Sequence, residues 1–71
     1  MIGILCNRKR ERAIARHLHS MLKLIARGNE VHVIVFSMPN TNLLQRTVYG
    51  SLVSSEEIIP VKAPLPMLIF N

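Results

Sequence analysis

The sequence predicts an α/β fold, a small two-layer or three-layer Rossmann-like βαβ unit with a parallel sheet and a small β-hairpin beside it. Two short apolar runs, 2–6 and 31–36, have the composition of interior strands. Between them, apolar residues recur at helical spacing and share one side of a helix: Ile14, Leu18, Met21, Leu22 and Ile25. A strand, a crossover helix and a parallel strand in this order form a right-handed unit.

The ends of the predicted helix are marked by residues that favour caps. Gly28, in the segment Arg27-Gly28-Asn29, can take the left-handed conformation that helix ends favour, so we expect the helix to end there. Asn7 is a suitable N-cap, with Arg8-Lys9-Arg10 in the first turn. In the alternative, the helix begins near Glu11 and leaves these cations in a solvated loop.

The second half of the chain predicts shorter extended pieces. A turn at 37–42 precedes two extended segments, 47–53 and 58–61, which we expect to pair as a small hairpin at the sheet edge. Residues 62–66 contain two prolines and predict a stiff connector. Residues 67–70 predict a third buried strand.

Length and composition predict one domain over residues 1–71. The chain is 49% hydrophobic and 18% charged, which makes disorder improbable. Its net charge of +5 lies in the first half of the chain. Residues 1–30 contain seven basic residues (Lys or Arg) and two Glu, whereas residues 31–71 contain two basic residues and two Glu. A basic region of this kind attracts phosphate ligands, nucleic acid or an acidic partner, unless it is simply a solvated helix face.

The basic loop after the first strand is the candidate ligand site. Three consecutive cations, Arg8, Lys9 and Arg10, are unfavourable at a helix start, where the backbone already carries partial positive charge. Ligands of open parallel sheets bind at the carboxyl ends of the strands, where this loop would lie. A bound anion would offset the repulsion, so these residues are anion-binding or substrate-binding candidates.

The outer face of the predicted helix is basic, which suggests a second class of function. Five residues share the side opposite the apolar stripe: Arg12, Arg16, His19, Lys23 and Arg27. They could bind an acidic protein or nucleic acid, although no aromatic residues interleave with them. The sequence predicts no metal site, because His17 and His19 point about 200° apart on a helix. It predicts no catalytic residue either.

Several features predict an intracellular protein that needs a partner. No apolar run approaches the ~18 residues that cross a bilayer, and basic residues follow the first apolar run rather than precede it, unlike a secretory signal. The one cysteine, Cys6, cannot form an internal disulfide. One predicted helix would leave a face of the parallel sheet bare. We therefore expect a fragment of a larger chain, or self-association.

Several motifs together resemble the start of the endospore coat-associated ATP-grasp family. They are Ile2-Gly3-Ile4-Leu5, Arg27-Gly28-Asn29-Glu30-Val31, Val48-Tyr49-Gly50 and the closing segment 63–71, with Pro64-Leu65-Pro66 leading into an apolar strand that ends in Phe70-Asn71. The resemblance spans the whole chain but only the family's N-terminal, pre-ATP-grasp domain. Similar domains occur in glutathione synthetase-like ligases.

The resemblance implies a small α/β domain that is not catalytic alone and supports substrate binding or assembly beside an ATP-grasp module. ATP and magnesium would be cofactors of the full-length, ligase-like parent and not of this chain. The domain would line the acceptor side of the cleft, which adds Asn71 to the anion-binding candidates Arg8, Lys9 and Arg10. The implied location is cytoplasmic, with association to the spore coat.

Overall fold

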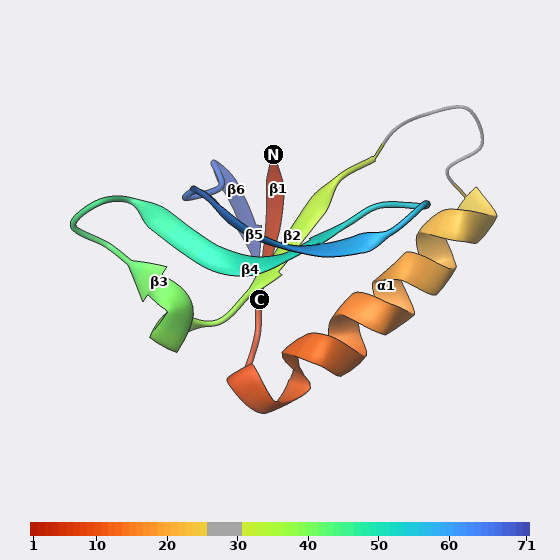
Figure 1. Cartoon of the computed structure of the whole chain (residues 1–71), viewed down its shortest axis with the longest axis horizontal. Helices are drawn as coiled ribbons and strands as arrows, with labels where there is room; N and C mark the ends of the chain where they lie inside the picture. The colour runs from red at the N-terminus through yellow and green to blue at the C-terminus, as the bar shows by residue number, and fades with distance from the viewer. Residues whose placement is uncertain (26–30) are drawn as a thin grey trace.

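The computed structural model describes residues 1–25 and 31–71. Within them the chain forms a six-stranded sheet and one α-helix (Figure 1). In chain order the elements are β1 (Ile2–Leu5), the 3-10 helix η1 (Arg8–Arg10), α1 (Glu11–Ile25), β2 (Val33–Phe36), the 3-10 helix η2 (Met38–Asn40), β3 (Thr41–Asn42), β4 (Thr47–Val53), β5 (Ile58–Pro64) and β6 (Leu68–Phe70). The predicted helix end at Arg27-Gly28-Asn29 lies outside the described residues.

The predicted Rossmann-like fold with a parallel sheet is wrong, because the sheet is mixed and curls into a half-barrel. β1 lies between β2 and β6 and is parallel to both. β4 is antiparallel to β2, and β3 continues along the same edge of β4. A further parallel strand beside β2 would need another crossover, whereas the short η2–β3 return lets β4 pair with β2 directly.

The β4–β5 hairpin is present, and it is longer than the sequence predicted. Seven residue pairs join the two strands, from Val53–Ile58 at the turn to Thr47–Pro64 at the far end. Lys62 and Pro64 therefore belong to β5 rather than to a connector, which leaves only residues 65–67 between β5 and β6. Pro60 and Pro64 are tolerated because β5 lies at the edge of the sheet.

α1 packs on the convex face of the sheet through a narrower stripe than predicted (Figure 1). Ala15 and Leu22 are buried against Val35 and Val53, with Ile14 and Leu18 at the margin. Two residues of the predicted stripe lie outside this contact: Met21 is 45% exposed and Ile25 is 71% exposed. The contact is centred on Ala15, whose small side chain lets the helix approach the sheet closely.

The other face of the sheet is covered by the chain itself, so the expectation of a bare face is wrong for the centre of the sheet. Ile34, Phe36 and Val48 are buried there in a second core cluster. The curl of the sheet brings Val61, Ala63 and Leu65 over them, and Pro66 is buried. The backbone N–H of Leu65 donates to the carbonyl oxygen of Arg46 at 2.7 Å, which closes this end of the half-barrel.

β6 is an exposed edge strand and not the buried strand that its apolar sequence predicted. Leu68, Ile69 and Phe70 are 40–53% exposed, because β6 pairs on one side only, with β1. No helix within residues 1–25 and 31–71 is long and apolar enough to cross a membrane.

Candidate functional site

The carboxyl ends of β1, β2 and β6 meet at one edge of the sheet, because these three strands are parallel. The residues that follow the strands are Cys6 after β1, Ser37 after β2 and Asn71 after β6. The backbone N–H of Cys6 donates to the carbonyl oxygen of Phe36 at 3.0 Å, which extends the β1–β2 ladder by one bond. We call this region the carboxyl edge.

The basic turn Arg8–Arg10 stands on the carboxyl edge as a capped 3-10 helix. The Asn7 side-chain oxygen accepts a hydrogen bond from the backbone N–H of Lys9 at 3.1 Å, and its carbonyl oxygen accepts one from the N–H of Arg10 at 2.9 Å. α1 begins only at Glu11, so the three cations precede the α-helix, as in the later of the two starts considered above. All three side chains are exposed and available to a ligand.

Asn71 is brought to the same edge by the β1–β6 register. Ile4 pairs with Phe70, so Asn71 follows at the end of β1 that leads into the basic turn. The fold thus places all four sequence-predicted site residues, Arg8, Lys9, Arg10 and Asn71, at one end of the sheet. Asn71 is exposed.

Burial raises the pKa of two ionisable groups beside the basic turn. Burial, followed by the negative charge of Glu11, raises the pKa of the Cys6 thiol, while Arg10 lowers it. Burial also raises the pKa of the Glu11 carboxyl, while Arg8 lowers it. A thiol with a raised pKa is a poor nucleophile at neutral pH, so Cys6 is better explained by packing than by catalysis.

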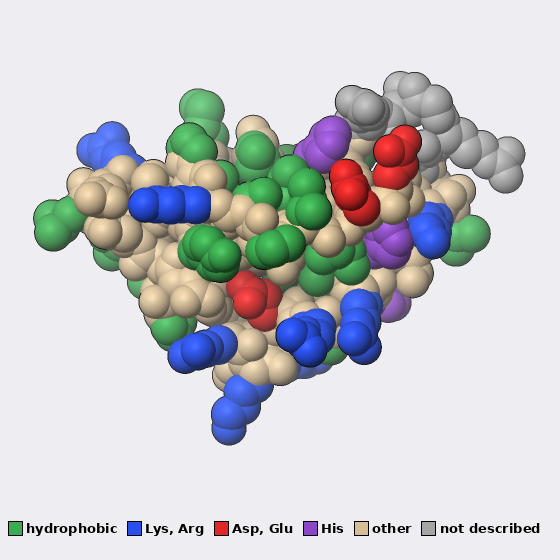
Figure 2. All heavy atoms as spheres, in the orientation of Figure 1, with side chains coloured by type: hydrophobic (Ala, Val, Ile, Leu, Met, Phe, Trp, Pro, Cys, Tyr) green, Lys and Arg blue, Asp and Glu red, His purple; other side chains and the backbone are tan. Residues whose placement is uncertain are grey.

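A cavity of about 280 Å³ lies between the start of α1 and the β4–β5 hairpin. Arg12 and Arg16 line it together with Glu11 and Ser51. One carboxyl oxygen of Glu11 is buried without a hydrogen-bond partner. The two arginines are exposed, so the basic face of α1 borders this cavity as well as open solvent. Figure 2 shows Lys and Arg side chains gathered over η1 and the first half of α1.

His19 does not belong to the basic outer face that the sequence predicted. Its Nδ1 atom lies 2.7 Å from the carbonyl oxygen of Ser54, and the side chain is half-buried between α1 and the β4–β5 turn. Arg12, Arg16 and Lys23 are exposed. Arg27 lies outside the described residues. In the described part of the chain, no group of three or more His, Cys, Asp or Glu residues could hold a metal ion.

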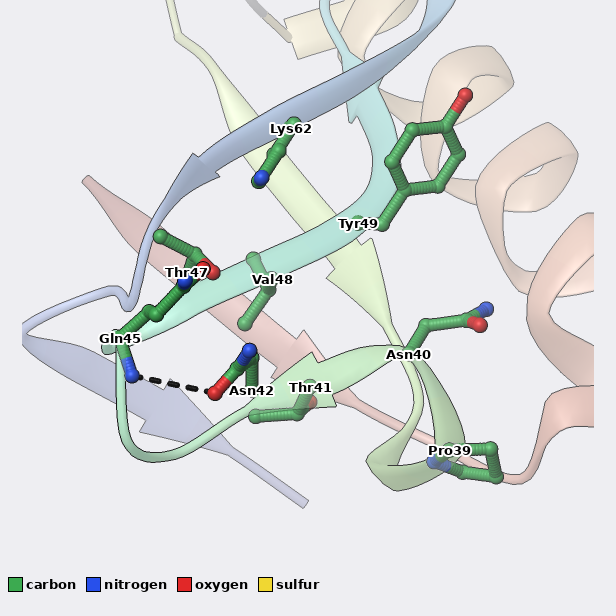
Figure 3. Close-up of a pocket in the computed structure, with 9 residues that line it drawn as sticks. All are labelled: Pro39, Asn40, Thr41, Asn42, Gln45, Thr47, Val48, Tyr49 and Lys62. Carbon is green, nitrogen blue, oxygen red and sulfur yellow. Dashed lines mark hydrogen bonds between the residues drawn. The ribbon is translucent and has the colours of Figure 1, made fainter.

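A polar pocket of about 310 Å³, which the sequence did not predict, lies beside β3 and the first half of β4 (Figure 3). Its lining residues are Pro39, Asn40, Thr41, Asn42, Gln45, Thr47, Val48, Tyr49 and Lys62. The polar residues 40–42 ahead of the exposed Tyr49 were the available signal, but Lys62 joins the pocket only through the β4–β5 register, in which it pairs with Tyr49.

The walls of the polar pocket are fixed by hydrogen bonds within the chain. The Thr41 hydroxyl donates to the carbonyl oxygen of Ser37 at 3.0 Å, and the Asn40 N–H donates to the same oxygen at 3.1 Å. The Asn42 side-chain oxygen accepts from the backbone N–H of Gln45 at 3.1 Å, as Figure 3 shows. The pocket is therefore formed before any ligand binds.

Comparisons with protein-family models, with curated proteins and with solved structures found no match to this chain. Its function is therefore inferred from the side chains described above.

Proposed function

We propose that this chain is a non-catalytic domain that holds an anionic substrate at its carboxyl edge, as the resemblance to the N-terminal domain of endospore coat-associated ATP-grasp proteins implies. The observation that carries the proposal is the position of Arg8, Lys9, Arg10 and Asn71 at the end of the sheet where β1, β2 and β6 stop. The proposal keeps the location that the resemblance implies, the cytoplasm with association to the spore coat.

Electrostatics supports an anion at this edge. Three adjacent cations repel one another, and the η1 turn contains no acidic residue. The nearest carboxyl along the chain belongs to Glu11, the first residue of α1, and burial raises its pKa. An anion bound on the exposed turn would relieve the repulsion and gain several hydrogen bonds from charged donors.

The chemistry of ATP-dependent ligation is assigned to the parent protein and not to this domain. We assign ATP and magnesium to the ATP-grasp module of the parent because the sequence of this chain has no glycine-rich phosphate loop. The domain would contact the ATP-grasp module or a second copy of itself. The exposed apolar strand β6 is the surface proposed for that contact.

A second candidate function rests on the basic face of α1. Arg12, Arg16 and Lys23 are exposed on one helix, which suits an interaction module for an acidic protein or a nucleic acid. Binding of nucleic acid through these residues would rest largely on counterion release and would weaken steeply with salt.

Two variants with equal charge change separate the candidates. The edge variant replaces Arg8, Lys9 and Arg10 by Gln, and the helix variant replaces Arg12, Arg16 and Lys23 by Gln. We would titrate inorganic phosphate, citrate and a single-stranded oligonucleotide into each protein and follow backbone amide signals by NMR. The edge proposal expects citrate to shift the signals of residues 7–11 and 71, and expects only the edge variant to lose this binding.

Three results would contradict the edge proposal. They are equal loss of citrate binding in both variants, oligonucleotide binding that only the helix variant loses, and the absence of any shift at residues 7–11. Addition of ATP and magnesium tests the non-catalytic assignment. Turnover, or nucleotide affinity in the low micromolar range, would overturn it.

A further inference from the structure

We infer that the polar pocket beside β3 and β4 binds a single sugar unit that carries a carboxylate. The pocket shares no residue with the carboxyl edge, so this inference is independent of the proposed function. Its volume of about 310 Å³ is at the lower limit of ligand sites, which suits one sugar ring rather than a nucleotide or a longer chain.

The lining of the pocket is unusually rich in uncharged hydrogen-bonding groups. Asn40, Asn42 and Gln45 contribute carboxamides, and Thr41 and Thr47 contribute hydroxyls. The Asn42 oxygen is occupied by the Gln45 N–H, which leaves the Asn42 amide group free to donate. Carboxamides and hydroxyls both donate and accept, as the hydroxyl groups of a sugar require.

One aromatic ring borders this polar surface. Tyr49 is 55% exposed and belongs to neither core cluster, although a tyrosine ring buries readily. Figure 3 shows its ring on the side of the pocket opposite Asn42, with Asn40 and Pro39 below it. An exposed ring beside hydrogen-bonding groups offers an apolar surface to the C–H face of a sugar. Pro39, in η2, offers a second apolar surface.

The charge of the pocket selects an acidic sugar. Lys62 pairs directly with Tyr49 across β4 and β5, so both side chains project from the same face of the sheet. No Asp or Glu lines the pocket. A lysine without a carboxylate beside it favours a ligand with one negative charge, whereas phosphate sites usually combine several cations or backbone N–H groups.

NMR titration of the 15N-labelled chain tests this inference. The probes are glucuronate, glucose, acetate and inorganic phosphate, all at constant ionic strength. We expect glucuronate to shift signals of residues 39–49 and 62 in a saturable manner and to bind about tenfold more tightly than glucose. Lys62→Gln removes the charge and leaves a polar side chain one atom shorter, and we expect it to weaken glucuronate about tenfold and to leave glucose unchanged.

Two further variants keep the test decisive. Lys23→Gln removes an equal charge from α1 and should leave glucuronate binding unchanged. Tyr49→Leu should weaken glucose and glucuronate alike, and it changes a side chain outside the core clusters. The inference is overturned by glucuronate shifts confined to residues 7–11, by acetate or phosphate binding the pocket as tightly as glucuronate, or by no shift of residues 39–49.

Discussion

The Nδ1 atom of His19, on α1, lies 2.7 Å from the carbonyl oxygen of Ser54 in the β4–β5 turn. Because a carbonyl oxygen only accepts, Nδ1 must carry the proton of this hydrogen bond. The bond joins residues 35 positions apart and fixes the middle of the helix to the tip of the hairpin. It also removes His19 from the basic surface to which its helical position had assigned it.

Loss of the His19 hydrogen bond should destabilise the fold. His19→Leu fills the position with an apolar side chain but leaves the Ser54 carbonyl without its partner, so we expect a loss of about 1 kcal/mol in the free energy of unfolding. His19→Gln retains a donor and should recover part of the loss. Chemical denaturation measures both, with His17→Leu on the exposed side of α1 as the control. Equal effects at the two histidines would contradict the assignment.

Glu11 should make the stability depend on pH. Its pKa in the folded state lies above the ordinary value of 4.5, so between these two values the folded state binds more protons than the unfolded state. Stability therefore falls as pH rises through this window. Glu11→Gln should remove the fall and stabilise the protein at pH 7, with little effect at pH 4.

The matched control for Glu11 is Glu57→Gln, which removes an equal charge from the exposed hairpin turn. Denaturation of the three proteins at pH 4 and pH 7 gives the comparison. If Glu11→Gln changes the free energy of unfolding equally at both pH values, the buried carboxyl is not the cause. The same conclusion follows if Glu57→Gln produces the same change.

Gly50 allows β4 to lie close to β2. A Cβ atom at this position would contact the Val35 carbonyl oxygen and would lie 2.9 Å from the Cβ of Phe36. Both neighbours belong to a buried strand and cannot move aside cheaply. Gly50→Ala should therefore cost about 1–3 kcal/mol of stability. Ser51→Ala, one residue along β4, should change stability by less than about 0.5 kcal/mol. Thermal unfolding of the two variants decides this, and a neutral Gly50→Ala would show that the strands can separate.

The two edges of the sheet predict self-association through β6. β5 carries Pro60, Lys62 and Pro64, which obstruct pairing with another strand, whereas the residues of β6 are all apolar. Ile69 and Ile59 are 40% and 39% exposed on the two edges and form a matched pair. Light scattering should find particles larger than 8.1 kDa for the parent chain and for Ile59→Lys, and monomers for Ile69→Lys. A monomeric parent chain, or equal behaviour of the two variants, would contradict this use of β6.

The sequence was a good guide to local structure and a poor guide to how the strands pair. The β-branched run 33–36 and the spacing of Leu18 and Leu22 marked β2 and α1 correctly. Nothing in the residues of 47–53 states whether that strand runs with or against β2, because alternation fixes faces and not direction. The short return through η2 decides the direction, and so the antiparallel pairing of β4 with β2 was not predicted.

The difference between local structure and strand pairing also explains which parts of the candidate sites the sequence predicted. Arg8, Lys9 and Arg10 are adjacent in the chain, so their charge could be read directly. Asn40 and Lys62 are 22 positions apart and meet at the polar pocket only because Tyr49 pairs with Lys62. His19 was misplaced because helical spacing alone gives no information about the Ser54 carbonyl opposite it.

The order of strands also has a consequence for synthesis on the ribosome. Of the six strands, β1 is made first, and its neighbour β6 is made after the other five. Until residues 68–70 emerge from the exit tunnel, β1 is itself an unprotected edge, and the close contact of Pro66 with Gly3 cannot form. Until then β1 is an exposed apolar segment of the nascent chain, which a chaperone that binds apolar segments would recognise.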